Sequence, residues 1–233
     1  MEVTNLNYKI KNKIILNDIN LKFDKNGIYT IIGPNGSGKT TFLNILNKTI
    51  EKTSGEILIN NQKIETIKNK DFYKILSSMS QHQNIFHKID VEYFLKLNRY
   101  IVTKSLTIDE KTEEIIEIFK LKPFLNQLLT TLSGGELQRV ILASVFLLET
   151  KYILLDEPFT YIDIGIQIEL SEIIYKYFAQ KHIIIMSSHS INFFEYSNSV
   201  IALKNGKIFF NTDCVTKNHI IDLFNIPNNL QLF

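Results

Sequence analysis

The chain has 233 residues, 45% of them hydrophobic, so it can bury a sizeable core as one large domain or as a core domain with an appended lobe. Two independent domains would be cramped at this length. The 26 basic and 24 acidic side chains leave a net charge of +2 and form no basic tail, so no nucleic-acid partner is expected.

The N-terminal part of the chain is expected to form antiparallel strands. Val3 to Ile10 alternates as a strand does, and Ile14 to Phe23 predicts two short strands around Asn17-Asp18. Gly27 then turns the chain into a further strand. Tyr8 lies on the first of these strands, where its ring could stack on the adenine of a bound nucleotide or pack on the face of the strand.

A glycine-rich turn follows and carries the pattern G-x-x-x-x-G-K-[ST] in full, with Gly33, Gly38, Lys39 and Thr40 at its fixed positions. Glycines there let the backbone curl so that successive N–H groups face phosphate oxygens, and the N-terminus of the following helix adds partial positive charge. Lys39 is expected to reach the β- and γ-phosphates of a nucleotide, and the Thr40 hydroxyl to bind Mg²⁺. The turn therefore predicts a phosphate-binding loop.

After that helix the pattern returns to strands. Gly55 to Asn60 and Ile75 to Ser80 predict strands, and Lys68 to Lys74 predicts a short helix between them. The second strand ends at Gln81, and the carboxyl end of a strand is where ligands bind in open α/β sheets. Gln81 is therefore a candidate ligand-binding side chain.

Asp90 to about Asn126 shows helical periodicity and contains no predicted strand, and Pro123 breaks the pattern. An acidic pair at Asp109-Glu110 begins its second helical segment. We expect this block to form a helical lobe inserted in the α/β core rather than a linker.

The run Leu132-Ser-Gly-Gly-Glu-Leu-Gln-Arg139 precedes an apolar helical stripe. Ser133 with Glu136 three residues later is the pattern of a capping box. Capping does not account for Gly134 and Gly135, which leave the N–H groups of the helix bare and suit a second contact with an anion.

Two buried-type strands end in polar side chains. Tyr152 to Asp156 is apolar up to its last residue, and the two acids Asp156 and Glu157 are expensive there unless a metal or a reaction holds them. Asp156 is a candidate Mg²⁺ ligand, and Glu157 a candidate for polarising the attacking water. Ile183 to Met186 leads to His189, which could donate to the γ-phosphate.

The cysteine content and the length of the apolar runs indicate the cellular compartment in which the chain acts. Cys214 is the only cysteine, which excludes an intramolecular disulfide and a cysteine-based zinc site and fits a reducing compartment. Met1 to Asn12 contains no apolar signal segment, and the longest apolar stretch, around Val140 to Leu148, is far shorter than the ~18–20 residues of a membrane-spanning helix. We therefore expect the chain at the cytoplasmic face and not to enter a membrane by itself.

Together these motifs resemble the ATP-binding cassettes of the ABC transporter superfamily over nearly the whole chain. Tyr8 matches the adenine-stacking aromatic residue, and the signature has Glu136 where glutamine is usual. The matching motifs are the Walker A loop at Gly33 to Thr40, the Q-loop at Gln81, the signature at Leu132 to Arg139, Walker B at Tyr152 to Glu157, the D-loop at Thr160 to Asp163 and the H-loop at His189.

The resemblance implies a role for each matching residue. Catalytic roles fall on Lys39, Gln81, Glu157 and His189. The implied Mg²⁺ ligands are Thr40, Gln81 and Asp156. The implied nucleotide contacts are Tyr8, Gly33, Pro34, Asn35, Gly36, Ser37, Gly38, Lys39, Thr40, Thr41, Ser133, Gly134, Gly135, Glu136 and Asp163.

The resemblance also implies an architecture. We expect an α/β fold: a P-loop NTPase core, which is a mixed sheet with flanking helices, together with an N-terminal antiparallel β subdomain and an inserted helical lobe. The expected single domain covers residues 1–233, with the antiparallel part at 1–30, the core at 31–81 and 150–210, the helical lobe with the signature helix at 82–149, and a C-terminal tail at 211–233.

The implied function is ATP hydrolysis in a transporter. By resemblance, two copies form a head-to-tail homodimer with ATP and Mg²⁺ held between the Walker A loop of one copy and the signature of the other. The dimer would dock on integral membrane permease subunits, with a separate substrate-binding protein. The stretch from Ser80-Gln81-His82 through Asp90-Val91 to Leu97-Asn98-Arg99-Tyr100 is similar to cassettes of iron–siderophore, haem and vitamin B12 importers, although Asn98 and Ile101 stand where glycine and proline are usual. This resemblance implies import of an iron–siderophore or related metal chelate.

Two other functions stay open. One is a soluble ABC ATPase for cytosolic complex assembly, such as iron–sulfur assembly, and the other is the ATPase of an ABC exporter. A P-loop kinase or GTPase is excluded because neither uses the run from Leu132 to Arg139. Co-purification with a multi-span permease would separate the transporter from the soluble ATPase.

Overall fold

The computed structural model describes residues 1–80, 88–160, 162–188 and 191–227. Within these ranges the fold is centred on a six-stranded sheet with the strands β3 (Gly27–Ile32), β6 (Leu76–Met79), β7 (Tyr152–Asp156), β8 (Ile183–Ser187), β9 (Ser199–Lys204) and β10 (Lys207–Thr212). Their order across the sheet is β10-β9-β3-β8-β7-β6. Neighbouring strands are parallel, except that β10 runs antiparallel to β9.

The central sheet is covered on both faces. Every residue of β3, β7 and β8 is buried, and continuous apolar runs of this kind are typical of parallel strands that pack on both sides. Alternate side chains point to opposite faces, so Ile153 and Leu155 enter one hydrophobic core while Tyr152 and Leu154 enter another. The sheet therefore separates two cores with different coverings.

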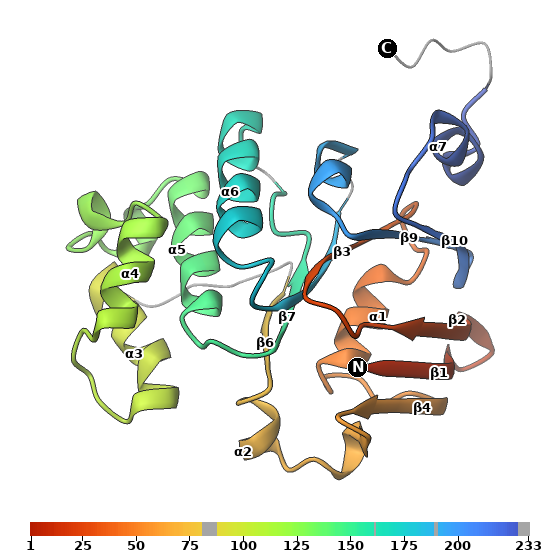
Figure 1. Ribbon diagram of the computed structural model, residues 1–233, viewed down its shortest axis with the longest axis horizontal. Helices are drawn as coiled ribbons and strands as arrows, with labels where there is room; N and C mark the ends of the chain where they lie inside the picture. The colour runs from red at the N-terminus through yellow and green to blue at the C-terminus, as the bar shows by residue number, and fades with distance from the viewer. Residues whose placement is uncertain (81–87, 161, 189–190, 228–233) are drawn as a thin grey trace.

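A four-stranded antiparallel sheet, counted over the described residues, covers the core that holds Tyr152 and Leu154 (Figure 1). Its strands are β1 (Glu2–Ile10), β2 (Lys13–Lys22), β4 (Ser54–Ile59) and β5 (Gln62–Lys63), in the order β2-β1-β4-β5. Helix α1 (Lys39–Leu46) packs in the same core through Phe42 and Leu46. The expected mixed core sheet and antiparallel subdomain are confirmed.

The prediction of two short strands between Ile14 and Phe23 is wrong, because β2 is one continuous strand. Asp18 lies inside it with a positive φ of 55°, and the pairing with β1 shifts register around this point. Asn5 Nδ2 donates to the Asp18 carboxylate at 2.8 Å, and the Asp18 N–H donates to Asn7 Oδ1 at 3.0 Å. The second bond satisfies the backbone N–H of Asp18 and the first holds its side chain, so the strand continues through the Asn17-Asp18 pair that resembles a turn.

Strands of the two sheets alternate along the chain, so a boundary between the antiparallel part and the core at residue 30 does not separate the two sheets. The resemblance places β4 and β5 in the core at 31–81, but both strands pair within the antiparallel sheet, where Ile57 and Ile59 are buried with Val3. The strand β10 extends to Thr212, and the predicted C-terminal tail contains α7 (Lys217–Phe224). Leu223 of α7 packs in a small core with strand β9.

The predicted helical block from 90 to 126 contains two helices, α3 (Val91–Thr103) and α4 (Glu110–Ile118), and both begin at aspartate N-caps. Asp90 accepts the Tyr93 N–H at 2.7 Å, and Asp109 accepts the Thr112 N–H at 2.9 Å. They gather with α5 (Gly134–Phe146) on the side of α6 (Ile164–Tyr177) that lies away from the antiparallel sheet (Figure 1). In the described ranges no helix has the length and apolar character needed to cross a bilayer.

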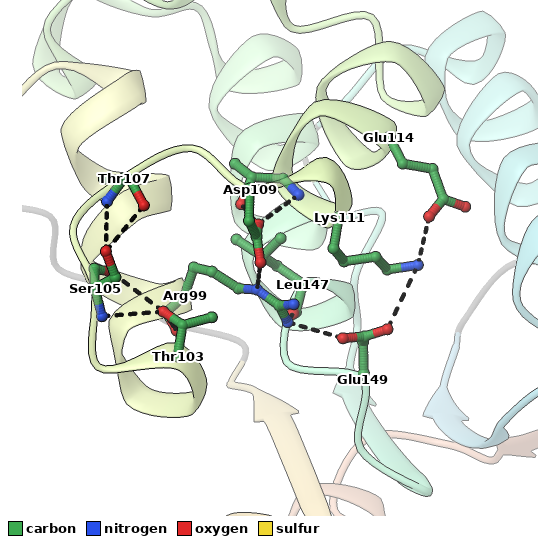
Figure 2. A network of polar contacts seen from close by, with 10 residues as sticks. Arg99, Thr103, Ser105, Thr107, Asp109, Lys111, Glu114, Leu147 and Glu149 are labelled. Carbon is green, nitrogen blue, oxygen red and sulfur yellow. Dashed lines mark hydrogen bonds and ion pairs between the residues drawn. The ribbon is translucent and has the colours of Figure 1, made fainter.

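A buried arginine ties these helices together (Figure 2). Arg99 of α3 is 7% exposed, and its guanidinium donates to Asp109 at 2.8 Å, to Glu149 at 2.8 Å and to the Leu147 carbonyl at 2.9 Å. Lys111 of α4 forms a longer ion pair with the same Glu149, at 3.8 Å. Because Asp109 begins α4 and Glu149 follows α5, one side chain joins three helices of the lobe.

We expect Arg99→Ala to lower the free energy of unfolding by ~3 kcal/mol, because the partly buried Asp109 carboxylate, the exposed Glu149 carboxylate and the Leu147 carbonyl lose their shared buried donor. The matched control is Lys96→Ala on the same helix, which removes a more exposed ion pair with Glu92 and should change the free energy by less than ~0.5 kcal/mol. Urea titration followed by circular dichroism measures both. Equal losses in the two variants would contradict a linking role for Arg99.

Candidate active site

The loop between β3 and α1 has the geometry of a phosphate cradle. Gly33 has a φ of 151° and Gly38 a φ of 106°, and both pack too closely for a side chain. A Cβ at Gly33 would lie 2.1 Å from the Leu203 carbonyl oxygen, and one at Gly38 would lie 2.6 Å from Leu16 Cδ2. The loop therefore depends on glycine to close against β9 on one side and β2 on the other.

This loop forms one wall of a cavity of about 340 Å³. Every residue from Asn35 to Thr41 lines the cavity, together with Lys13 and Ile15 of β2 and Glu157 after β7. The cavity thus lies where the central strands end, and it is shared by segments that are far apart in the sequence.

Lys39 places a buried cation in this cavity. Lys39 is only 5% exposed, and its Nζ donates to the Gly33 carbonyl at 2.8 Å. Burial lowers the pKa of Lys39, and the negative charges of Glu157 and Asp156 act in the opposite direction. The hydroxyl Oγ of Ser37 is also buried and has no hydrogen-bond partner among the described residues. A buried cation and an unsatisfied hydroxyl on one loop fit a bound polyanion.

The acids at the end of β7 are held by a serine of the neighbouring strand. Asp156 is 5% exposed and accepts hydrogen bonds from Ser187 Oγ at 2.6 Å and from Thr40 Oγ1 at 3.2 Å. The same Ser187 hydroxyl oxygen accepts the Glu157 N–H at 2.8 Å, and Thr160 Oγ1 donates to the Glu157 carboxylate at 3.2 Å. The structure therefore brings the predicted Mg²⁺ ligands Thr40 and Asp156 into contact and turns Glu157 toward the cavity.

The run from Leu132 to Arg139 begins α5 as predicted. Ser133 and Glu136 form the expected capping box, with the Ser133 N–H donating to Glu136 Oε2 at 2.8 Å. Gly135 lies against α6, since a Cβ there would be 2.6 Å from Ile166 Cδ1. Close packing against α6 therefore explains why position 135 is a glycine, whereas Gly134 is exposed.

Several predicted site residues do not reach the cavity within one chain. Ser133, Gly134, Gly135 and Glu136 do not line it, and neither does Asp163, which is the N-cap of α6. Tyr8 lines a separate cavity of about 210 Å³ with other residues of β1 and β2. Gln81 and His189 lie outside the described residues.

Three residues at the site are absent from the sequence predictions of function. Lys13 and Ile15 line the cavity from β2, and no local motif marks them. Ser187 pairs directly opposite Asp156 in the parallel ladder of β7 and β8, which is why its hydroxyl meets both acids. In the sequence, Ser187 is recognisable only as a hydroxyl residue at the end of a buried-type strand, and that pattern does not reveal which residue it bonds to.

The start of α5 is held in place through Arg139, the last residue of the run that begins at Leu132. Arg139 donates to both carboxylate oxygens of Glu169 on α6, at 3.2 and 2.6 Å, and Lys120 donates to the same carboxylate at 2.7 Å. The hydrogen bonds from Arg139 are the main cause that lowers the pKa of Glu169 from 4.5 to about 2. This pair fixes the signature-like segment relative to α6.

Comparison with known proteins gives consistent matches. The family described as "ABC transporter" matches residues 16–160. The petrobactin import ATP-binding protein YclP of Bacillus subtilis (strain 168) is 32% identical over 214 residues, which cover 89% of this chain and 84% of YclP. The "Probable siderophore transport system ATP-binding protein YusV" of the same organism is 29% identical over 84% of this chain and 74% of its own length.

Solved structures match the fold. The dimeric bacterial ABC transporter cassette MJ0796 superposes with a TM-score of 0.81 at 23% identity, over 92% of this chain and 99% of that chain. At this identity the match supports the fold alone.

We expect stability to depend on pH through Glu169. Its pKa is about 2 in the folded chain against an ordinary 4.5, so the ionised carboxylate contributes stability that is complete above pH ~4.5 and is lost as pH falls toward 2. Glu169→Gln should therefore lower the free energy of unfolding by ~1–2 kcal/mol at pH 7, after allowance for its partial exposure.

The loss in Glu169→Gln should shrink at pH 4 and shrink further at pH 3, as measured by urea titration at each pH. Glu172→Gln, which changes an exposed glutamate of the same helix, is the matched control. A loss in Glu169→Gln that is the same at all three pH values would contradict the ion-pair explanation.

Proposed function

This chain belongs to the ABC transporter family and is an ATP-binding ATP hydrolase, and we propose that it powers the import of an iron–siderophore complex. The observation that carries the proposal is one shared cavity. The phosphate loop with Lys39 lines it, Glu157 faces it, and Asp156 bonds to Thr40 at 3.2 Å. The cargo class rests on relatives named for petrobactin and siderophore transport.

We place the triphosphate of ATP on the loop from Gly33 to Thr41, with Pro34 and Asn35 in its outer part. The buried Lys39 supports this placement, because its ammonium would exchange the Gly33 carbonyl for phosphate oxygens of full charge. The hydroxyl of Ser37 would gain its missing partner. Lys13 adds a second positive charge at the same cavity.

We propose Mg²⁺ at Thr40 and Asp156, with Gln81 completing the protein ligands. Hydroxyl and carboxylate oxygens are the hard ligands that Mg²⁺ prefers, and the first two residues already lie in contact. When bound, the ion neutralises charge on the β- and γ-phosphates. Ser187 would hold Asp156 in position for this role, since its hydroxyl donates to the same carboxylate.

For the reaction itself we propose Glu157 as the general base that accepts the proton of the attacking water. Thr160 supports this role because its hydroxyl donates to the Glu157 carboxylate and so orients it. We keep His189 as the donor toward the γ-phosphate. Catalysis would then depend on positioning and on charge stabilisation around the phosphates.

We propose that two chains pair head to tail so that each signature completes the site of the other. Within one chain, Ser133, Gly134, Gly135 and Glu136 lie away from the cavity, and so does Asp163. A two-fold arrangement would bring these segments of the second copy over the phosphate loop of the first. The N-terminus of α5 would then face the γ-phosphate with its partial positive charge.

The chain acts as a peripheral subunit on membrane permease partners. We propose that it lies on the cytoplasmic face, that the helical lobe and the Q-loop segment contact the permease, and that a separate binding protein delivers the cargo. We also propose that residues 1–233 act as one domain, because both cores share the central sheet.

Isolation from native membranes tests the importer against the two alternatives. We expect the tagged full chain to co-purify with a multi-span permease, and its ATPase rate in reconstituted vesicles to rise with a binding protein loaded with a ferric siderophore. Recovery without any membrane protein would favour a soluble assembly ATPase. Stimulation by a substrate added on the cytoplasmic side alone would favour an exporter.

We expect Glu157→Gln to bind ATP with near-normal affinity and to hydrolyse it at least ~10²-fold more slowly, because the amide keeps the size of the carboxylate but not its basicity. Single-turnover hydrolysis and nucleotide titration measure the two effects. Hydrolysis at the wild-type rate would remove Glu157 from the role of general base.

Slow hydrolysis in Glu157→Gln also allows a test of the dimer. We expect this variant to elute as a dimer when ATP is added, and the double variant with Ser133→Arg to stay monomeric while still binding ATP. The long cation would occupy the space next to the opposing γ-phosphate. A double variant that still forms the ATP-dependent dimer would contradict the head-to-tail arrangement.

A further inference from the structure

The turn that follows β7 holds its first residue in an unfavourable backbone conformation. Glu157 has a φ of 50°, which lies in the left-handed region that favours glycine. The next residue is Pro158, and a proline restricts the residue before it to extended conformations. Two local features therefore oppose the conformation of Glu157, so contacts with other groups must stabilise it.

The later part of this turn is held by its own backbone and by a pair of aromatic rings. The Thr160 N–H donates to the Glu157 carbonyl at 3.3 Å. The ring of Phe159 stacks on the ring of Phe193, with 4.4 Å between the centroids and an angle of 6° between the planes, and both side chains are buried. These contacts fix the residues on both sides of Pro158.

The carbonyl of Pro158 itself is bonded by a side chain of helix α5. Gln138 Nε2 donates to this carbonyl and also to Met79 Sδ, at 3.8 Å, so the nitrogen of the amide faces two acceptors. Pro158 is buried, and among the described residues no other group donates to its carbonyl. A buried carbonyl without a donor is costly, so the turn depends on Gln138 for its present geometry.

We propose that Gln138 is a positioning residue for the general base: by binding the Pro158 carbonyl, it holds Glu157 in the left-handed conformation that turns its carboxylate toward the nucleotide. The inference rests on the role proposed for Glu157. Glu157 lines the cavity of the phosphate loop, and Gln138 is not among the described residues that line it. Gln138 therefore acts through the turn and not on the nucleotide.

Single-turnover hydrolysis and titration of the full chain with ATP and Mg²⁺ test this role. We expect Gln138→Leu, which keeps the size of the side chain but cannot donate, to slow hydrolysis at least ~10-fold while ATP affinity changes less than about twofold, because a displaced catalytic group costs rate rather than binding. Gln138→Glu keeps the side chain polar but also lacks the N–H donor, and it should show the same loss.

The matched control is Gln127→Leu. It removes an exposed amide that donates to another proline carbonyl, that of Pro123, at 3.4 Å. Because this contact lies on the surface of the helical lobe, the rate of hydrolysis should change less than about twofold.

A double-mutant cycle separates positioning from a general structural effect. If Gln138 acts through the base, adding Gln138→Leu to Glu157→Gln should slow the residual hydrolysis less than about twofold. ATP should still convert this double variant into a dimer, because Ser133 and the glycines at the start of α5 are unchanged.

Three results would overturn the inference: an unchanged rate in Gln138→Leu, a loss confined to ATP affinity, or a further loss of about tenfold when Gln138→Leu is added to Glu157→Gln. Failure of the proposed function has a different signature. In that case Glu157→Gln would itself hydrolyse ATP at the wild-type rate, and Gln138 would have no base to position.

Discussion

A buried positive charge and a buried negative charge lie close to each other at the carboxyl end of the central sheet, and the rest of the site depends on this pair. Lys39 and Asp156 are each 5% exposed, and neither is in direct contact with the other in the described interactions. Charges in such positions are costly unless hydrogen bonds or ligands compensate them. The carbonyl of Gly33 and the hydroxyls of Thr40 and Ser187 provide that compensation within the chain. Bound ATP would give Lys39 partners of full negative charge in place of the Gly33 carbonyl.

The central sheet explains how residues from distant parts of the chain come together around one cavity. Its carboxyl edge collects the phosphate loop after β3 and the acids after β7, while Ser187 at the end of β8 bonds to the backbone and side chain of those acids. One face of the sheet supports the antiparallel sheet, whose strand β2 borders the cavity. The other face supports the helices, including α5 with the signature-like start.

The helical lobe has its own set of charged contacts that hold it as a unit. Arg99 joins α3 to the start of α4 and to the segment after α5, and that segment leads directly into β7 (Figure 2). Arg139 and Glu169 join α5 to α6. These contacts connect α3 with α5 and with the segment that precedes β7. Packed helices with such links move as rigid bodies more readily than they deform.

Several local features of this protein follow from its sequence pattern alone, because their geometry is encoded over a few neighbouring residues. The glycines of the phosphate loop, the Ser133 capping box and the apolar strand ending at Asp156 each follow from short-range sterics or hydrogen bonding, and the structure has all three. The roles implied for Gln81 and His189 stay predictions, since both lie outside the described residues.

Contacts between distant segments, in contrast, are visible only in the folded chain. Ser187 reaches Asp156 through strand pairing, and β4 and β5 join the antiparallel sheet through burial of Ile57 and Ile59. The physical reason is the same in each case. Pairing partners and register are set by the burial of side chains from distant segments, which no short pattern along the chain records.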